Sequence, residues 1–370
     1  MQITSSGPAH GWPEYRKLLM DPAAARTGAA NEDDLVAALS GDTEAFRALT
    51  DRYSRELHLH CYRVLGSLDD AEDAVQETLL RAWRHLATFE ARSSLRAWLY
   101  RIATNVSLTH VKRKRRDLPV LPKPLADAVA RGNEPEIDLS PYPDILLDEL
   151  ESTMGDPAAQ YDQRESIQLA FLAAVQVLPA RQRAVFLLRD VLNFSTDEVA
   201  GMLETTAASV NGALHRARAT IDQQRADGRL HLGRIVPTDD TQRSIVQRYV
   251  EAWEAVDIRG LARLLKSDVV LTMPPLPVRY SGRAEVATFF ATVPSGGALD
   301  RFRLIPTRAN LQPALGVYRL NTDTNTYRAW GIWVLSLDGE AIAEITAFVD
   351  ERLFPRFRLP SEVDSKLRPV

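Results

Sequence analysis

An acidic, proline-rich stretch constrains this chain more than any other feature of its sequence. Residues 117–160 contain seven prolines and ten acidic residues but only two basic residues, Lys123 and Arg131. Proline blocks long helices because it lacks an N–H, and an excess of eight negative charges disfavours collapse. We therefore expect an extended linker here, with a short helix near residues 145–150, and separate domains on either side.

The 370 residues are enough for two or three domains. The single cysteine, Cys61, excludes an internal disulfide framework and fits a reducing cytosol. We find no apolar run long enough to span a membrane and no signal peptide, and Met20 is an alternative start. The expected divisions are a disordered segment (1–30), a helical domain (31–116), the linker (117–160), a second helical domain (161–228), an α+β domain (235–358) and a tail (359–370).

The second helical domain carries the strongest local signal. Ser195 and Glu198 form a capping box, in which each side chain satisfies a backbone N–H of the other residue. A short helix begins there, and a turn at residues 204–205 leads to Thr206. We expect Thr206 to cap a second helix over residues 207–221.

This second helix separates a core face from a polar face. Val210, Leu214 and Ala217 are expected to face the core. Short polar groups near the start of such a helix suit base edges, and arginines suit phosphates. The pattern indicates a DNA-binding helix-turn-helix, with an ordinary helical hairpin as the alternative.

Residues 178–221 resemble the promoter −35-binding domain of extracytoplasmic-function (group IV) sigma factors. The resemblance rests on Leu178-Pro179, Arg181-Gln182-Arg183 and the ending Leu214-His215-Arg216-Ala217-Arg218. It departs from the family at residues 211–213, Asn-Gly-Ala, where basic or small hydroxyl residues are usual. The residues that the resemblance places near the −35 element are Thr206, Ser209, Asn211, His215, Arg216 and Arg218.

The first helical domain resembles the core-binding segment of the same family, on the residues CYRVLGSLDDAEDAVQETLLRAWR at 61–84. We expect a helix after an N-cap pair, Asp69-Asp70, with Leu80 standing out on its polar face. Single exposed leucines are ordinary, but one ringed by charge also suits an anchor in a partner surface. The resemblance implies that the clamp helices of the polymerase β′ subunit are contacted by Asp73, Gln76, Glu77 and Leu80.

Residues 89–105 resemble the segment that melts and reads the −10 element. Strand opening requires a pocket for a flipped base, polar groups for its edge and cations for the phosphates. The basic run 112–116 suits the last role, although such a run is also typical of a solvated helix end. His110 stands where the family commonly has aspartate. The residues implied at the −10 element are Phe89, Arg92, Ser94, Arg96, Trp98, Arg101, Asn105, Lys112 and Arg113.

The resemblance also implies a role for the acidic linker (117–160). In the family, the segment between the two domains threads through the polymerase toward the active centre and the RNA exit channel. A negatively charged chain suits a groove that has evolved for nucleic acid. A solubilising spacer explains the same composition.

Residues 235–370 change to helices followed by strands, the order of an α+β domain. Their order and hydrophobic pattern resemble the SnoaL-like, polyketide-cyclase-like fold, a curved sheet wrapped by helices around a conical pocket. We expect helices over 241–253 and 260–265, and strands over 269–273, 304–311, 314–320, 326–337 and 341–349.

Chemistry in this C-terminal domain is not expected. Catalytic members of the fold use an acid/base pair, often His and Asp, and this chain has no histidine after His231. The available carboxylates are those of Asp257, Asp268, Glu344 and Asp350. Eight side chains either line a pocket or fill a solid core: Tyr249, Trp253, Met273, Phe290, Tyr318, Trp330, Trp333 and Phe348.

The sequence therefore predicts a multidomain protein with two all-α domains, the second a helix-turn-helix, followed by a SnoaL-like α+β cone. The predicted function is that of a cytoplasmic alternative sigma factor that is not an enzyme. Its expected partners are the β and β′ subunits of core RNA polymerase and promoter DNA, with an anti-sigma factor or a small ligand at the C-terminal domain. No cofactor, metal or membrane is expected. The alternatives are a ligand-sensing helix-turn-helix regulator without polymerase, and a cyclase or isomerase with a DNA-binding segment.

Overall fold

The structure, a computed structural model, describes residues 28–89, 94–114, 139–151, 176–226, 238–274 and 276–364. The chain divides into two compact units. The first comprises Met1–Leu65, Asp69–Leu118 and Ala180–Ala217, and the second comprises Gly66–Leu68, Pro119–Pro179 and Arg218–Val370. No helix in the described ranges is long and apolar enough to cross a membrane.

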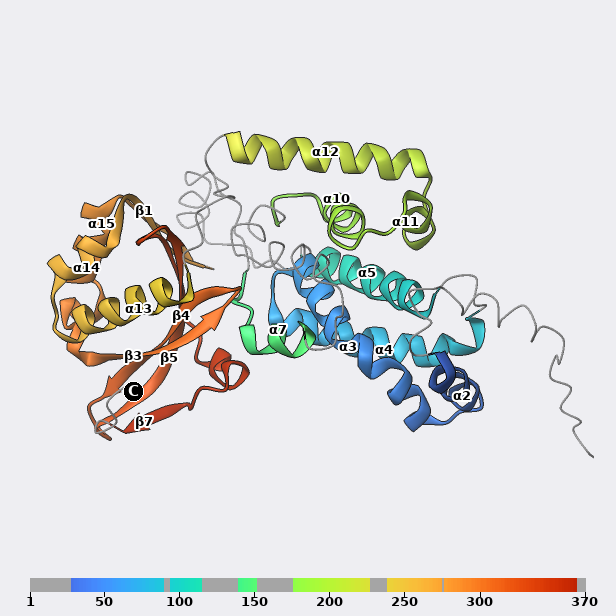
Figure 1. The fold of residues 1–370 in the computed structure, drawn as a ribbon, viewed down its shortest axis with the longest axis horizontal. Coiled ribbons are helices and arrows are strands. Elements are labelled where there is room, and N and C mark those ends of the chain that lie inside the picture. The colour runs from blue at the N-terminus through green and yellow to red at the C-terminus, as the bar shows by residue number, and fades with distance from the viewer. Residues whose placement is uncertain are drawn as a thin grey trace, which may run out of the picture. The chain divides into compact units, whose positions relative to one another are not determined.

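The first unit begins with four helices, α2 (Gly28–Leu39), α3 (Thr43–Leu65), α4 (Leu68–His85) and α5 (Leu95–Lys114) (Figure 1). Helix α3 starts where the Asp42 carboxylate accepts the backbone N–H groups of Glu44 and Ala45. Helix α4 begins at Leu68, so Asp69 and Asp70 lie in its first turn and are not its N-cap pair. Their charges favour the positive end of the helix dipole from that position.

The helix-turn-helix has the predicted construction. A short helix α10 (Ala180–Phe186) and a π-helical turn (Leu187–Val191) lead to α11 (Thr196–Met202) and α12 (Ala207–Ala226). The capping box of Ser195 and Glu198 is confirmed, with both reciprocal hydrogen bonds present. The expected core residues of α12, Val210, Leu214 and Ala217, are buried.

Helices from both sequence segments pack together within the first unit. The guanidinium of Arg183 on α10 is buried and donates to the carbonyl oxygen of Val64, at the end of α3, over 2.5 Å. The ring of Phe194, just before α11, packs on Tyr100 of α5 with centroids 5.3 Å apart. The two helical segments of the sequence therefore share one packed unit.

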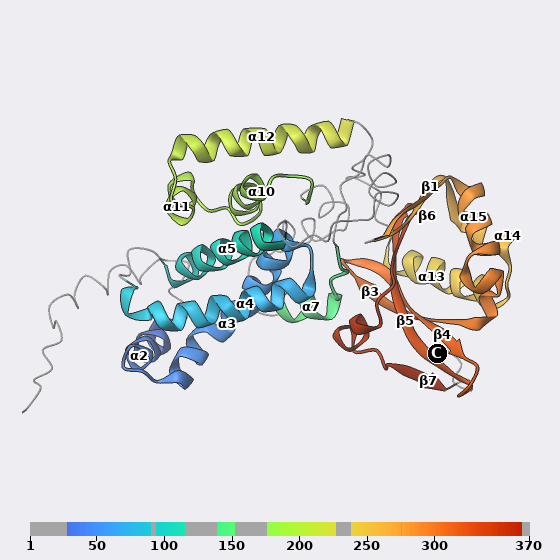
Figure 2. The same ribbon diagram turned by 180° about the vertical axis from the view of Figure 1, so that it is seen from behind.

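The second unit is built on a mixed, open sheet of seven strands (Figures 1 and 2). The path runs β2-β1-β6-β5-β4-β3, with β7 paired to β5, and β1–β6 is the parallel pair. Helix α13 lies against the concave side of the curved sheet. The elements are α13 (Asp239–Glu254), α14 (Ile258–Leu264), β1 (Leu265–Met273), β2 (Leu276–Ser281), α15 (Arg283–Thr292), β3 (Phe302–Ala309), β4 (Gln312–Asn321), β5 (Thr326–Asp338), β6 (Ala341–Phe348) and β7 (Glu362–Asp364).

The five predicted strands of this unit are confirmed within a few residues at each end. Strand β2 and helix α15 are absent from the prediction, and so is β7, which lies in the segment expected to be a tail (359–370) and pairs with β5. Strand β2 is short and contains Pro277, which is unusual inside a strand, and α15 follows Gly282 without a side-chain cap. Both elements therefore lack the local signals from which the others are predicted.

The interior of the cone is a solid aromatic core. Trp253 is fully buried, donates its Nε1–H to the carbonyl oxygen of Leu299 and meets Trp333 edge to face, with ring centroids 5.2 Å apart. Tyr249 and Phe290 are buried in the same cluster. Of the two readings of the aromatic set, the solid core is confirmed for these four residues.

Part of the acidic linker is folded onto this unit. The predicted short helix is confirmed as α7 (Asp144–Glu151). Just before it, the backbone N–H of Tyr142 donates to the side chain of Asn310 and its carbonyl oxygen accepts the N–H of the same residue, both over 2.8 Å. The Asp144 carboxylate accepts from the N–H of Leu311 at 2.7 Å and from Arg308 at 3.1 Å. Residues 139–144 are therefore held at two places instead of running free as a spacer: Ser140 is bonded to Gly66 and Leu68, and Tyr142 and Asp144 are clamped at the β3–β4 turn.

The close approach of β5 to the end of β6 makes Gly331 sensitive to substitution. A Cβ there would lie 2.4 Å from the backbone oxygen of Phe348, whereas at Gly316 it would meet mainly the end of the Leu359 side chain. We expect Gly331→Ala to lower the free energy of unfolding of this unit by about 1–3 kcal/mol, and Gly316→Ala to lower it less. Urea unfolding followed by tryptophan fluorescence measures both, and equal effects would contradict the steric argument.

The clamp should depend on pH. Burial raises the pKa of the Asp144 carboxyl to about 6, whereas the unfolded chain releases this proton near pH 4. The contribution of this group to stability is thus full below pH 4 and is lost as pH rises to 6. We expect the free energy of unfolding to fall by about 1–3 kcal/mol over this interval relative to Asp144→Asn, measured by urea unfolding of both proteins. Parallel pH profiles would refute the assignment.

Candidate nucleic-acid and partner interfaces

A hollow on the first unit gathers all four residues predicted to bind core polymerase. Its volume is about 290 Å³, and the wall from α4 consists of Asp73, Gln76, Glu77, Leu80 and Arg81. The wall from α5 consists of Val106, Thr109, His110 and Arg113. The α4 residues recur every three or four positions, which places them on one helix face.

Leu80 is the exposed apolar side chain in this hollow, and its neighbours on α4 are polar or charged. It is 51% exposed, so its side chain is available to a partner. Glu77 lies one turn away and accepts a hydrogen bond from Arg81 at 2.7 Å, and this bond lowers the pKa of the Glu77 carboxyl. The four α5 residues of the hollow were not predicted as a partner surface. They recur every three or four positions, and this spacing in the sequence indicates that they share one face of α5.

The aromatic residues predicted at the −10 element pack around the start of α5. Phe89 is buried, and its ring lies 5.2 Å from that of the partly exposed Trp98. Ser94 is exposed, and its hydroxyl accepts the N–H of Ala97 in the first turn of α5. Arg92 lies outside the described residues.

Arg96, predicted as a phosphate contact, lies in a polar cluster of the first unit. Its guanidinium pairs with the Glu56 carboxylate at 2.9 Å and stacks over the rings of Tyr100 and Phe194. The Tyr100 hydroxyl donates to the same carboxylate at 3.2 Å. A charge held by these partners gives a structural explanation for Arg96 that the sequence reasoning did not consider.

Two further residues predicted at the −10 element contact the end of α11 and the turn that follows it. Arg101 forms an exposed ion pair with Glu204 at 2.8 Å, and the Asn105 amide donates to the carbonyl oxygen of Met202 at 3.1 Å. Lys112 and Arg113, near the end of α5, are exposed. Of the predicted −10 cations in the described ranges, Arg101, Lys112 and Arg113 are exposed, whereas Arg96 is partly buried.

The polar face of α12 is exposed as predicted. Thr206 accepts the N–H of Ser209 at 3.2 Å and thereby caps the helix. The Arg181 guanidinium donates to the carbonyl oxygen of Leu203 at 3.0 Å and so holds the turn before α12. The exposed predicted −35 residues are Thr206, Ser209, Asn211, His215, Arg216 and Arg218.

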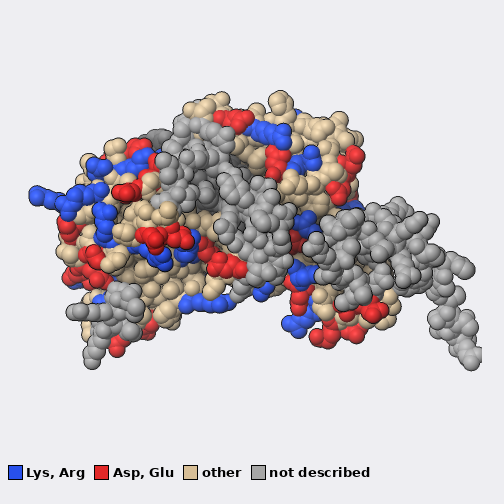
Figure 3. All heavy atoms as spheres, viewed as in Figure 1, with Lys and Arg blue, Asp and Glu red and all other residues tan. Residues whose placement is uncertain are grey.

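Charge over the surface is mixed. Figure 3 shows Lys and Arg interspersed with Asp and Glu on the face in view, in keeping with the net charge of −4. The net charge therefore does not indicate a nucleic-acid surface, and the predicted DNA contacts rest on local groups such as the arginines of α12 and the end of α5.

Two of the four carboxylates singled out in the second unit, Asp257 and Asp350, have structural roles. Asp257 accepts the N–H of Gly260 and caps α14. Asp350 accepts from the backbone and guanidinium of Arg352, and this pairing lowers the pKa of its carboxyl. Asp268 is exposed, and Glu344 lies on β6. Among the described residues of the second unit there is no histidine beside these four carboxylates, since none follows His231 in the sequence.

Comparison with known families matches each part of this architecture. The sigma-70 region 2 family matches residues 49–117, the sigma-70 region 4 family matches residues 168–221, and the SnoaL-like domain family matches residues 246–345. The structure aligns with the crystal structure of the Mycobacterium tuberculosis extracytoplasmic function sigma factor SigJ with a TM-score of 0.53 at 22% identity. That alignment covers 86% of this chain and 100% of the SigJ chain, and it supports the fold.

A helical unit with regions 2 and 4, joined to a SnoaL-like domain, defines a sigma factor with a C-terminal extension. The ECF RNA polymerase sigma factor SigG of Mycobacterium tuberculosis is 40% identical to this chain over 322 residues, which cover 86% of this chain and 85% of SigG. SigW of Bacillus subtilis is 29% identical over 187 residues, covering 50% of this chain and 92% of SigW. The chain belongs to the extracytoplasmic-function (ECF) RNA polymerase sigma factors, and it is an alternative sigma factor that directs transcription initiation.

Gly212 lies inside α12, where no close neighbour requires a glycine. A Cβ there would meet only the Arg216 guanidinium, at an ordinary 3.5 Å. We expect Gly212→Ala to raise the free energy of unfolding of the helical unit by about 0.5–1 kcal/mol. The control Ala219→Gly, at an exposed position of α12, should lower it by a similar amount. Circular dichroism at 222 nm during thermal unfolding measures both, and destabilisation by Gly212→Ala would show that the glycine has a packing role.

Proposed function

We propose that this cytoplasmic sigma factor holds core RNA polymerase at the α4–α5 hollow, opens the −10 element with α5 and reads the −35 element with α12. The observation that carries the proposal is the convergence of Asp73, Gln76, Glu77 and Leu80 on one hollow. A half-exposed leucine ringed by charged groups has the composition of an interface anchor with a polar rim.

Reading the −10 element requires α11 to move off α5. Arg101 and Asn105 are engaged by α11, so they are not free to contact DNA in this arrangement. The ion pair is exposed and is worth about 0–1 kcal/mol, and the hydrogen bond contributes about 1 kcal/mol. Binding to polymerase and promoter easily exceeds these energies, so we infer that the hairpin swings away when the holoenzyme forms.

The α12 face supplies the −35 contacts. Asn211 and Ser209 are near its N-terminal half, where an amide and a hydroxyl suit base edges. Arg216 and Arg218 suit phosphates, which position a helix without reading sequence. The assignment of each residue rests on this exposure and on the family resemblance.

The SnoaL-like unit serves regulation in this proposal and performs no catalysis. Its cone is filled by the aromatic core, and the carboxylates of Asp257 and Asp350 cap a helix or pair within the fold. Its clamp on residues 139–144 gives it a direct hold on the linker between the two sigma regions. We infer that this hold tunes how freely the linker enters the polymerase.

The decisive experiment is run-off transcription with purified core polymerase, on promoters selected from a random library by the holoenzyme. The full chain and a truncation after residue 230 should both direct specific initiation, at different levels. No promoter-specific transcript from either protein would refute the sigma mechanism. Equal output and equal core affinity of the two proteins would refute regulation by the SnoaL-like unit.

Leu80→Asp should abolish binding to core polymerase without unfolding the chain, because the side chain is half-exposed and an aspartate there would be buried unpaired on binding. The matched control is Leu39→Asp, at a leucine of α2 that is 48% exposed. Native gel shift with core polymerase measures binding, and circular dichroism checks the fold. Retained binding by Leu80→Asp, or equal loss in both variants, would overturn the assignment.

A further inference from the structure

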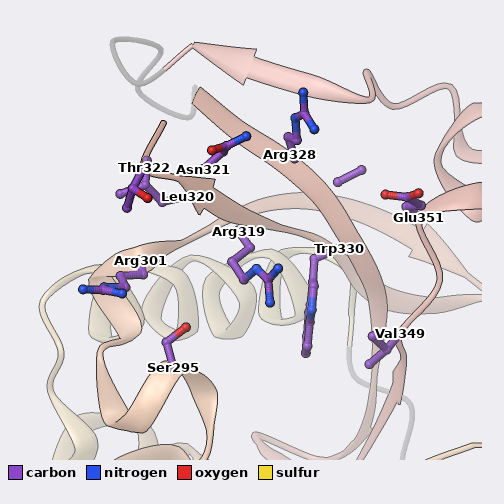
Figure 4. A pocket seen from close by; sticks show the side chains of 11 residues that line it. Ser295, Arg301, Arg319, Leu320, Asn321, Thr322, Arg328, Trp330, Val349 and Glu351 are labelled. Atoms are coloured by element: carbon purple, nitrogen blue, oxygen red, sulfur yellow. The ribbon is translucent and has the colours of Figure 1, made fainter. Parts of the chain in front are cut away.

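A second hollow, of about 710 Å³, opens on the SnoaL-like unit (Figure 4). It is formed by the ends of β4 and β5, the short helices before β3 and the segment after β6. Its volume lies within the range of about 300–1,000 Å³ that is usual for small-molecule sites. The charged and aromatic residues of its wall are Arg301, Arg319, Arg328, Glu351 and Trp330.

This hollow is distinct from the interior of the cone, which the aromatic core fills. Trp330 marks the boundary between the two. Its ring packs against Phe302 and Trp333, with centroids 5.4 Å and 6.2 Å away, and the same side chain lines the hollow. The ring is therefore fixed by the core on one side and offers a surface to the hollow on the other.

The cations of the hollow are poorly compensated by the protein itself. Arg319 on β4 and Arg328 on β5 are directly opposite in the strand register, a like-charge arrangement that is destabilising in a sheet. Among the described residues, neither they nor Arg301 forms an ion pair or a side-chain hydrogen bond. Glu362 is opposite Arg328 on β7, but its carboxylate is bonded to Thr326.

A β-bulge aligns the aromatic surface with one of these cations. The register between β4 and β5 shifts between Val317 and Tyr318, which leaves Trp330 as the extra residue of β5. Bulges re-aim side chains and occur often beside binding sites. Figure 4 shows the side chains of Arg319 and Trp330 side by side, directed into the hollow from neighbouring strands.

We propose that this hollow binds a small organic anion. Its carboxylate or phosphate lies on Arg319, with Arg301 and Arg328 at the rim, and its planar apolar body rests on the Trp330 ring. The anion offsets the positive charge that Arg301, Arg319 and Arg328 bring to the hollow, and a charge-assisted bond to a guanidinium is stronger than a neutral one. The site gives the C-terminal unit a ligand of defined chemistry, beyond its hold on the linker.

The test is isothermal titration of the full chain with 2-naphthoate, 2-naphthyl phosphate and the neutral 2-naphthamide. We expect at least one of the two anions to bind and the amide to bind at least tenfold more weakly, and the comparison of the anions identifies the preferred group. Arg319→Gln should weaken anion binding 10- to 100-fold, the loss expected for a charged hydrogen bond. Trp330→Leu should weaken the binding of all three ligands, because each of them places its ring system on the indole.

Arg303→Gln is the matched control, since Arg303 lies on neighbouring β3, stacks on Tyr327 and is not among the lining residues. It should bind as the unaltered chain does, and circular dichroism should be the same for all variants. Equal binding of the anions and the amide, unchanged binding by Arg319→Gln, or no binding of either anion would overturn the proposal. Displacement of the anions by a short single strand of DNA, dependent on Arg319, would assign the hollow to nucleic acid instead and would also overturn it.

Discussion

The helical unit depends on a partly buried polar cluster that joins α3 to α5, formed by Glu56, Arg96 and Tyr100. The carboxylate receives both the guanidinium and the tyrosine hydroxyl, and burial together with the nearby carboxylate raises the pKa of Tyr100. Removing one partner of such a cluster strands a charge in a poorly solvated place, which is costly. The Phe194 ring covers Arg96, so the cluster also fixes the segment that leads into the helix-turn-helix.

Contacts between regions 2 and 4 thus divide into firm and weak ones. Arg183 and Phe194 are buried and join α10 and its extension to α3 and α5. The contacts of α11 with Arg101 and Asn105 are an exposed ion pair and one partly buried hydrogen bond. A transition that begins at α11 therefore loses little energy at first, which suits the movement of the helical hairpin that we propose for promoter binding.

Features that depend on neighbouring residues were predictable from the sequence. The capping box at Ser195 and the buried stripe of α12 follow from spacing alone, and both are confirmed. The family resemblance and the order of the five long strands were sufficient to predict the architecture. Contacts between distant segments were not predictable: the pairing of Arg96 with Glu56, 40 residues away, and the seat of residues 139–144 on the β3–β4 turn leave no local pattern.

The β3–β4 turn has a consequence for where the second unit begins. Asn310 and Leu311 both adopt left-handed backbone conformations, with φ of 55° and 59°, and such strained residues persist when their surroundings hold them. Those surroundings are supplied by Tyr142 and Asp144, more than 160 positions earlier in the chain. Residues 139–144 thus behave as an intramolecular ligand of the SnoaL-like unit, kept at high effective concentration by the chain itself. The unit that folds cooperatively is then larger than the family match at 246–345. A C-terminal segment excised without residues 139–144 would expose the binding site that these residues fill in the full chain.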